Sequence, residues 1–265
     1  MTDTPIHSFA ICAHKECEFL DEAVASVSAQ THPSPAFIAT STPNAFIESV
    51  ARKYHLPLLV NPGPGGLRND WNFAYDQATT PWVTIVHQDD RYAPEYAQAF
   101  HEAIARYHDP VLFTTGYRPL RNGVLAPLDR NAKFKRILRF PLRFPRLAAS
   151  RFWKKAVLSC GNSFCCPSVA YNRSRLGPTL FDGDMVCCLD WHCYLGIARG
   201  EGAFAYDPRP LVHYRIHAGA GTVDSIATHA REREDARMLA EFWPRPLVPF
   251  ILHFYKSAYS VYDKL

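Results

Sequence analysis

The first half of the chain alternates short apolar runs with segments in which apolar residues recur every three or four positions. The apolar runs have the length and composition of buried strands, and they occupy residues 8–13, 36–40, 56–60 and 81–86. The periodic segments have the spacing of amphipathic helices, and they occupy residues 19–30, 43–55 and 69–78. Asn44 and Asn69 are placed to cap the second and third of these helices. The pattern therefore predicts a β-α-β-α-β-α-β array.

Such an array predicts a parallel sheet flanked by helices, and ligands of open parallel sheets bind at the carboxyl ends of the strands. Polar or small residues follow the four strands at this edge: His14, Ser41, Thr42, Gly65, Gly66, Asp89 and Asp90. The two adjacent carboxylates repel each other, and the simplest compensating charge is a divalent cation that also binds phosphate. The alternative is an Asp-Asp pair that only stabilises a turn or caps a helix.

Length and composition indicate one main domain. The 265 residues, 48% of them hydrophobic, are enough for one large core, and we expect a compact domain with a helical appendage. The chain has no apolar run long enough to span a bilayer and no secretory signal, so we expect a cytoplasmic protein with reduced cysteines. Residues 160–166 and 187–193 raise the alternative of structural zinc, but their spacing differs from the Cys-X2-Cys pairs of zinc modules.

Positive charge is concentrated in one stretch. Residues 130–155 contain ten lysines and arginines and no acid, so the rest of the chain carries a net charge of −6, against +4 for the whole. The cations alternate with aromatic and aliphatic residues, which suits peripheral attachment to an anionic membrane, binding of acceptor phosphates, or a solvated loop. Pro141 and Pro145 predict two short segments there rather than one helix. We expect no nucleic-acid partner, because no recognised motif accompanies this stretch.

Several ordered motifs between residues 7 and 222 resemble those of family 2 glycosyltransferases, which have the GT-A fold. The matching segments are "AICAHKECEFLDEAVASVSAQTH", "GGLRNDWNFAYDQAT", "HQDD" in place of Asp-X-Asp, "CCLDWHCYLGIARGEG" in place of the Glu-Asp helix, and "HYRIH" in place of Tyr-Arg-X-His. The resemblance implies an α/β fold with a Rossmann-like, mostly parallel sheet. It also implies a transferase domain over residues 1–222, with a nucleotide-binding half at 1–115 and an acceptor and catalytic half at 116–222, followed by a C-terminal helical extension at 223–265.

The resemblance implies metal-dependent, inverting transfer of a sugar from a nucleotide-sugar donor to a glycan or lipid-linked acceptor. Asp190 would be the base that takes the proton of the acceptor hydroxyl. Asp89, Asp90 and His217 would bind Mn²⁺ or Mg²⁺. The residues implied to bind the donor are Ala13, His14, Glu16, Ser41, Thr42, Gly66, Asn69, Asn72, Gln88, Asp89 and Arg215.

Three positions depart from the family pattern. His87 replaces the first acid of Asp-X-Asp, "TSTPN" replaces the acidic pair that contacts uridine in relatives, and Leu189 replaces the glutamate before Asp190. The first two departures support a second hypothesis, a noncatalytic protein on the same fold that binds a nucleotide or an anionic surface. The retained residues favour an enzyme, and they are Asp89, Asp90, Asp190 and His217.

Four assignments have structural alternatives. Asp190 also suits a helix cap or a pair with Arg199, and Arg215 suits a salt bridge as well as a phosphate clamp. A lone histidine such as His217 is often simply hydrogen-bonded. Trp71 and its neighbour Tyr75 suit core packing as well as a base pocket.

Overall fold

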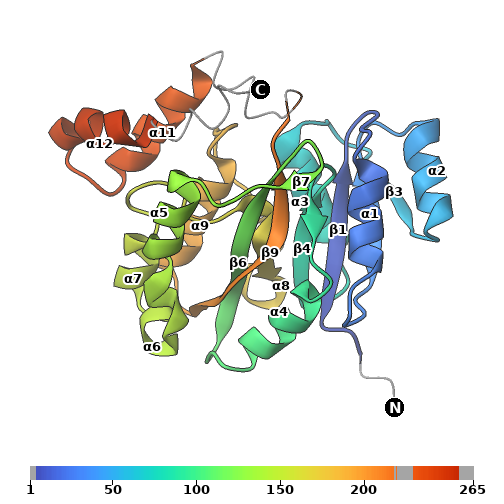
Figure 1. Ribbon diagram of the computed structural model, residues 1–265, viewed down its shortest axis with the longest axis horizontal. Coiled ribbons are helices and arrows are strands. Elements are labelled where there is room, and N and C mark those ends of the chain that lie inside the picture. Colours follow the sequence, from blue (N-terminus) through green and yellow to red (C-terminus); the bar gives the residue numbers. More distant parts are fainter. Residues whose placement is uncertain (1–3, 218, 220–228, 257–265) are drawn as a thin grey trace.

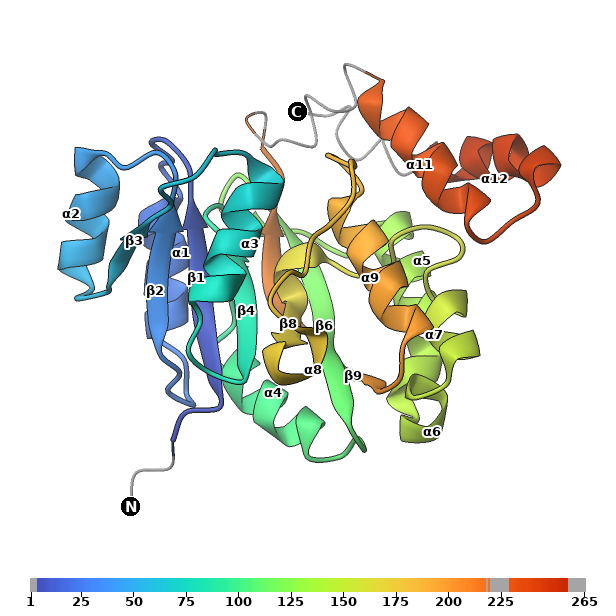
Figure 2. The ribbon, with the colours of Figure 1, turned by 180° about the vertical axis from the view of Figure 1, so that it is seen from behind.

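The N-terminal half of the chain folds as the predicted array, in a computed structural model that describes residues 4–217, 219 and 229–256 (Figure 1). Its strands are β1 (His7–Ala13), β2 (Ala36–Thr40), β3 (Leu58–Val60) and β4 (Trp82–His87). Its helices are α1 (Leu20–Ser28), α2 (Ala45–Lys53) and α3 (Leu67–Gln77). The strands pair in parallel in the order β3-β2-β1-β4, so their carboxyl ends meet at one edge. Figures 1 and 2 show α1 and α3 on opposite faces of the sheet.

The two predicted helix caps had different outcomes. Asn44 caps α2, because its side-chain oxygen accepts a hydrogen bond from the Ile47 N–H at 3.0 Å. The prediction for Asn69 was wrong: α3 begins at Leu67, and Asn69 lies inside its first turn. Gly66 precedes the helix with a φ of 109°, a left-handed conformation that favours glycine, so the turn itself starts the helix.

The second half of the chain extends the sheet with strands of both directions. These strands are β5 (Arg91–Tyr92), β6 (Pro110–Arg121), β7 (Val124–Leu125), β8 (Val169–Asn172) and β9 (Ala203–Arg215). Strand β8 runs antiparallel between β4 and β6, while β9 is parallel to β6. Over the described residues the strand order is β3-β2-β1-β4-β8-β6-β9-β5, with β7 on β6. The predicted α/β fold is confirmed, and the parallel N-terminal half continues into a mixed sheet.

Short helices follow β5 and β6 and cover the second half of the sheet. They are α4 (Tyr96–Ile104), α5 (Arg130–Leu138), η1 (Phe140–Arg143), α6 (Pro145–Ala148), α7 (Arg151–Ala156), η2 (Cys166–Ser168), α8 (Arg173–Leu176) and α9 (Leu189–Arg199). The basic stretch thus forms four short segments rather than the two predicted. Pro141 and Pro145 lie at the starts of η1 and α6. Proline is tolerated there because the first N–H groups of a helix have no acceptor within the helix, so a residue without an N–H loses no bond.

The C-terminal extension is helical, as predicted. It contains α11 (Ala230–Ala240), η3 (Arg245–Leu247) and α12 (Val248–Tyr255), while the predicted boundary at residues 222 and 223 lies outside the described residues. The extension packs on the main body: Trp243 Nε1 donates to the Ser159 carbonyl at 2.7 Å, and the Tyr255 ring lies 5.9 Å from that of Trp191. None of the helices in the described ranges has the length and hydrophobicity needed to cross a membrane.

The hydrophobic core lies on both faces of the central strands. Phe9 of β1 and Val83 of β4 are fully buried, and aromatic rings pack on the face that carries Phe9, where Phe9 contacts Tyr96 and Trp82 contacts Phe100. The buried His7 belongs to this core, with Nε2 2.8 Å from the Thr84 hydroxyl. This rigid centre fixes the loops at the carboxyl ends of β1 and β4, where the candidate site lies.

Candidate active site

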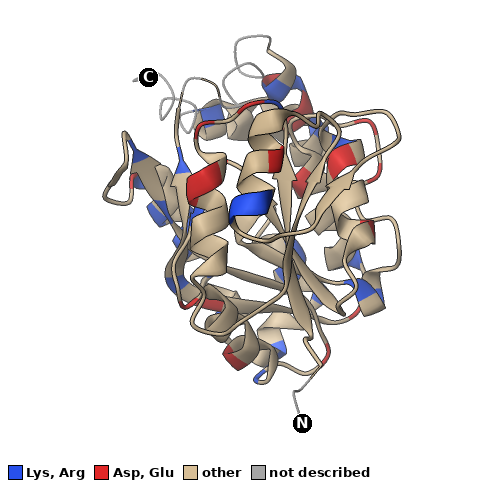
Figure 3. Ribbon diagram, turned by 90° about the vertical axis from the view of Figure 1, so that its right-hand side faces the viewer, with Lys and Arg blue, Asp and Glu red and all other residues tan. Residues whose placement is uncertain are grey.

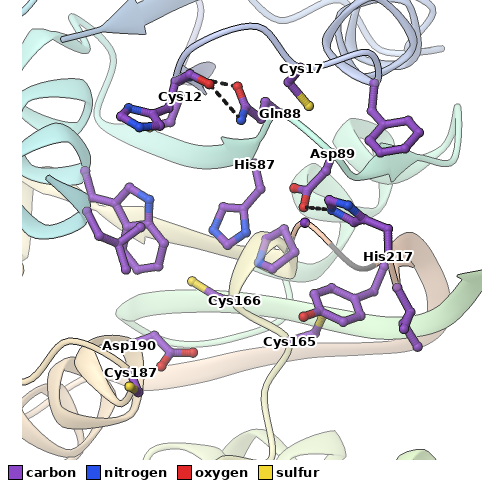
Figure 4. Close-up of a pocket in the computed structure, with 18 of the residues that line it drawn as sticks. Cys12, Cys17, His87, Gln88, Asp89, Cys165, Cys166, Cys187, Asp190 and His217 are labelled. Carbon is purple, nitrogen blue, oxygen red and sulfur yellow. Dashed lines mark hydrogen bonds and ion pairs between the residues drawn. The ribbon is translucent and has the colours of Figure 1, made fainter. Parts of the chain in front are cut away.

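A cavity of about 1260 Å³ opens at the carboxyl ends of β1 and β4 (Figure 4). It is lined by separate segments of the chain, which include the loop after β1, the start of α3, the end of β4, the start of α9 and the residues after β9. Eight of the residues predicted from the sequence line it: Ala13, His14, Glu16, Gly66, Gln88, Asp89, Asp190 and His217. The fold therefore brings most of the predicted site together.

Hydrogen bonds between loops fix the rim of this cavity. The His14 N–H donates to Gln88 Oε1 at 2.7 Å, and Gln88 Nε2 donates back to the His14 carbonyl at 3.2 Å. The Lys15 N–H donates to the Thr42 hydroxyl at 2.6 Å. The loops after β1, β2 and β4 are thus joined to one another, and Thr42 acts as a link between loops.

Some predicted site residues do not line the cavity formed by the described residues, namely Ser41, Thr42, Asn69, Asn72, Asp90 and Arg215. The Ser41 hydroxyl donates to Asp70 Oδ2 at 3.0 Å. The Asn72 amide is paired with the Phe181 backbone, to which Nδ2 donates at 2.7 Å and from which Oδ1 accepts at 2.9 Å. Side chains that the sequence suggested for donor binding therefore support the walls of the site.

The side chains of the two adjacent aspartates lie in different environments. Asp89 lines the cavity, and its Oδ2 lies 3.0 Å from His217 Nε2 (Figure 4). Asp90 is buried, and its Oδ1 accepts the Arg215 N–H at 2.8 Å. The other oxygen of Asp90 has no hydrogen-bond partner among the described residues and lies 3.7 Å from His87 Nδ1.

These environments shift the pKa values of the two carboxyls in opposite directions. Burial, together with the charge of Asp89, raises the pKa of Asp90 well above its ordinary value. Burial also acts to raise the pKa of Asp89, but the hydrogen bond to His217 and the charges of His87 and His217 outweigh it, so this pKa is lowered. Asp89 therefore carries negative charge more readily than Asp90.

The residues around Asp89 fit a divalent cation. His87, Asp89 and Asp90 each offer a ligand atom, and these atoms lie within 4.8 Å of one another. Buried polar atoms are normally paired, yet His87 Nε2 and Asp90 Oδ2 have no hydrogen-bond partner in the described structure. Carboxylate oxygens are suitable ligands for Mn²⁺ or Mg²⁺. Within the described ranges no comparable group forms from the cysteines, which are all free thiols.

Arg215 adopts the salt-bridge role that the sequence left open. Its Nε donates to the Asp89 carbonyl at 2.7 Å, and its guanidinium forms an ion pair with Glu22 and lies 4.1 Å from the centre of the Phe19 ring. Arg91 Nη1 binds the other oxygen of Glu22 at 2.6 Å. Arg215 therefore holds the backbone of the Asp89 turn against β9 and α1.

Asp190 lies on the other side of the cavity from Asp89 (Figure 4). It is in the first turn of α9, where Oδ1 accepts the Trp191 N–H at 2.8 Å and Oδ2 accepts from Asn162 Nδ2 at 2.6 Å. Burial raises the pKa of Asp190, although Arg231 and the two hydrogen bonds partly offset this effect. A carboxylate with a raised pKa in a cavity is suited to accept a proton. The alternative pair with Arg199 does not form, since Arg199 binds Glu241 at 2.6 Å.

Sequence reasoning missed several residues of the cavity wall: Asp70, Lys135, Asn162 and Arg231. Asp70 accepts hydrogen bonds from the Gly66 N–H and from Ser41, and its place in the "GGLRND" segment was an available signal. Trp71, left open between core and pocket, belongs to both: it is largely buried, lines the cavity and stacks on His87 at 5.0 Å. Tyr75 is a core residue whose hydroxyl donates to the Gly177 carbonyl at 2.9 Å.

The fold is shared with solved structures of glycosyltransferases. TarS of S. aureus, in complex with UDP-GlcNAc, has a TM-score of 0.62 and 15% identity over 93% of this chain and 70% of its own. The mannosyltransferase PcManGT of Pyrobaculum calidifontis, in complex with GDP-Man and Mn²⁺, has a TM-score of 0.64 and 18% identity over 95% of this chain and 69% of its own. At these identities the likeness establishes the GT-A fold.

The family is established by the sequence itself. No curated protein matches the chain at a significant level. The family model described as "Glycosyl transferase family 2" matches residues 8–172, which is more than half of the chain and includes β1 to β8. The matched region contains Asp89, while Asp190 and His217 lie beyond it. The chain therefore belongs to glycosyl transferase family 2 and is a glycosyltransferase with the GT-A fold.

Proposed function

We propose that the protein transfers a sugar from a nucleoside-diphosphate sugar to an acceptor hydroxyl, with inversion at the anomeric carbon and with help from a divalent cation. The main observation behind this proposal is that two carboxylates lie on opposite sides of one cavity. Asp89 lies beside His217 and the other candidate metal ligands, and Asp190 lies on the far wall with a raised pKa. The complexes of the structural neighbours with UDP-GlcNAc and GDP-Man support a nucleotide sugar as the class of donor.

In this reaction the acceptor oxygen forms a bond to the anomeric carbon while the bond from that carbon to the diphosphate breaks. The acceptor proton passes to Asp190, whose two hydrogen bonds hold it in place. The nucleoside diphosphate leaves on the Asp89 side, where His14, Gly66 and Gln88 form the walls. A divalent cation held by Asp89, with His87, Asp90 and His217 around it, would neutralise charge on the leaving diphosphate.

A donor panel tests this proposal against the noncatalytic alternative. Purified protein is incubated with UDP-, GDP- and dTDP-sugars in Mn²⁺, in Mg²⁺ or in EDTA, and released nucleoside diphosphate is measured. We expect release from at least one donor that depends on the cation. Tight nucleotide binding with no release from any donor, with or without a panel of sugar acceptors, would instead favour a noncatalytic binding protein.

We also propose that the enzyme acts at an anionic membrane surface, where a lipid-linked acceptor would lie. Every phenylalanine that is exposed in the described residues lies on α5, η1, α7 or α12 or beside them: Phe134, Phe140, Phe144, Phe152, Phe250 and Phe254. The same stretch, residues 130–155, carries seven exposed cations: Arg130, Lys133, Arg136, Arg143, Arg146, Arg151 and Lys155. We call these residues the basic-aromatic surface.

The arrangement of the helices supports a single surface. Figures 1 and 2 show α5, α6, α7 and α12 at the same end of the molecule, opposite α1 and α2. The hydrogen bond from Trp243 to the Ser159 carbonyl ties the extension to the residues just after α7. At the other end, the charged residues of α1 are all acidic, and α2 carries both acidic and basic residues (Figure 3). Cations near an anionic bilayer each contribute up to about 1 kcal/mol, and aromatic rings suit the bilayer interface.

Sedimentation with vesicles tests the membrane proposal. We expect the protein to bind vesicles that contain phosphatidylserine and not to bind neutral vesicles. Most of the binding should be lost when the salt concentration is raised from about 0.1 to 1 M. The double variant Phe152→Ala and Phe250→Ala should bind severalfold less, while Val60→Ala, an exposed apolar residue on β3, serves as control. No preference for anionic vesicles at low salt would contradict the proposal.

A further inference from the structure

Lys135 of α5 is a cation that faces the cavity and has no partner among the described residues. It is half-buried and lines the cavity, and no hydrogen bond or ion pair to it occurs within the described structure. Two other cations of the same basic stretch are buried, and both are paired: Arg139 donates to the Ser163 carbonyl, and Lys154 donates to the carbonyls of Gly200 and Gly202. A half-buried cation that has no partner among the described residues is available to pair with an anionic group in the cavity.

A second cation lies on the same side of the cavity. Arg231 of α11 lines the cavity, and its Nε lies 3.6 Å from the buried Asp235. Lys135, Arg231 and Asp190 all line this cavity, and the charges of the two cations lower the pKa of Asp190 against the effect of burial. Asp129 also lines the cavity, but it caps α5 by accepting the Ala132 N–H at 2.7 Å.

Positive charge beside a catalytic carboxylate fits an acceptor that is itself negative. An anionic acceptor is repelled by Asp190, and this repulsion has to be offset close to the point of attack. We propose that Lys135, supported by Arg231, forms an anion-binding subsite for the acceptor, and that the acceptor carries a phosphate or carboxylate group near the hydroxyl that attacks. This inference rests on the proposed glycosyl transfer and specifies the class of its acceptor.

The proposal divides the basic stretch into three roles. Arg139 and Lys154 hold the backbone of neighbouring segments, and the exposed cations belong to the basic-aromatic surface. Lys135 alone among the ten cations of residues 130–155 lines the large cavity. Burial lowers the pKa of Lys135 to about 8, so binding of an anion there should also favour its charged form.

Titration calorimetry in the presence of saturating nucleoside diphosphate and Mn²⁺ tests the subsite, because the donor position is then already occupied. The probes are methyl glucoside 6-phosphate, methyl glucuronide and neutral methyl glucoside. We expect at least one anionic probe to bind about tenfold more tightly than the neutral one, the effect of one charge-assisted hydrogen bond. The phosphate and carboxylate arms show which anion the subsite prefers.

Two lysine variants on the same helix separate the subsite from general charge. Lys135→Met should remove the preference for anionic probes, and Lys133→Met, an exposed lysine outside the cavity, should keep it. Thermal melting checks that both variants fold, which we expect because Lys135 makes no hydrogen bond or ion pair in the part of the chain that the structure describes. Lys135→Arg should restore most of the preference, since it retains the charge.

Three results would overturn the inference: no anion preference in the wild type, an unchanged preference in Lys135→Met, or anion binding that disappears once nucleoside diphosphate saturates the protein. The last result would assign Lys135 to the donor diphosphate. Binding of nucleoside diphosphate and of the anionic probes, each measured alone in separate titrations, tests the proposed transfer and the third result independently. An anion preference that depends on Lys135 would support the subsite even if no nucleotide bound. That outcome would contradict the proposed glycosyl transfer but not the anion-binding subsite.

Discussion

Asp190→Asn is expected to lower the rate of sugar transfer by about 10²- to 10⁴-fold, the usual contribution of a positioned general base. The substitution keeps the size of the side chain but removes its ability to take the acceptor proton. Donor binding should stay nearly unchanged, because the candidate metal ligands and the His14–Gln88 rim lie on the other side of the cavity. Transfer kinetics and nucleotide titrations on the same preparation would separate the two effects.

The fold of this variant should survive the change. The oxygen of the new amide still accepts the Trp191 N–H. The amide nitrogen then faces Asn162 Nδ2, which is also a donor, so that hydrogen bond is lost. That loss costs about 1 kcal/mol, and it is offset in part because a buried charge is removed as well. A melting temperature close to that of the wild type is the control. A variant that is folded and transfers sugar at the wild-type rate would exclude Asp190 as the base.

The pH dependence of transfer gives a further test of the base. Asp190 has to be deprotonated to act, so kcat/KM falls as pH decreases through its pKa. Because burial raises this pKa, the fall is expected at a higher pH than for an exposed aspartate, whose pKa is about 3.9. Asn162→Ala removes a hydrogen bond that favours the charged form, and it should move the fall to still higher pH. An acidic limb at the position of an ordinary aspartate would argue against this assignment.

The parts of the fold that depend on local patterns were predictable from the sequence. Apolar runs and helical periodicity gave all four N-terminal strands and their helices, and Asn44 caps α2 as its position indicated. Two features depended on longer-range contacts. The start of α3 is set by the backbone of Gly66, and the direction of β8 is set by its pairing with β4 and β6.

The site was also predicted only in part, because some of its residues are positioned by local sequence and others by long-range contacts. Residues that follow a strand directly, such as His14 and Asp89, reach the cavity because the strand end fixes their position. Asn72 and Arg215 were matched by motif, yet their polar groups are paired with partners far away in the sequence, Phe181 and Glu22. Lys135 lies in a stretch whose composition suggests a surface, and only the packing of α5 places it in the cavity.

Asp89→Asn is expected to remove most of the Mn²⁺-dependent part of nucleoside diphosphate binding, and Asp90→Asn much less. Both substitutions keep the volume of the side chain, and each leaves an oxygen for the bond that the aspartate now makes, to His217 in one case and to the Arg215 N–H in the other. Asp89 lines the cavity and has the lowered pKa, so it offers the charge that a cation needs, whereas Asp90 is buried behind it with a raised pKa.

We expect the loss for Asp89→Asn to exceed about tenfold in affinity, since disturbing even the partners of a metal ligand typically costs 10- to 100-fold. Calorimetric titration of nucleoside diphosphate with Mn²⁺ and with EDTA gives the metal-dependent part for each variant. The Asp90→Asn protein is the matched control, because it also removes a carboxylate from the same turn. Equal binding by both variants, unaffected by Mn²⁺, would mean that the two aspartates serve the fold and not a cation. A larger loss in Asp90→Asn would move the principal ligand to the buried carboxylate beside His87.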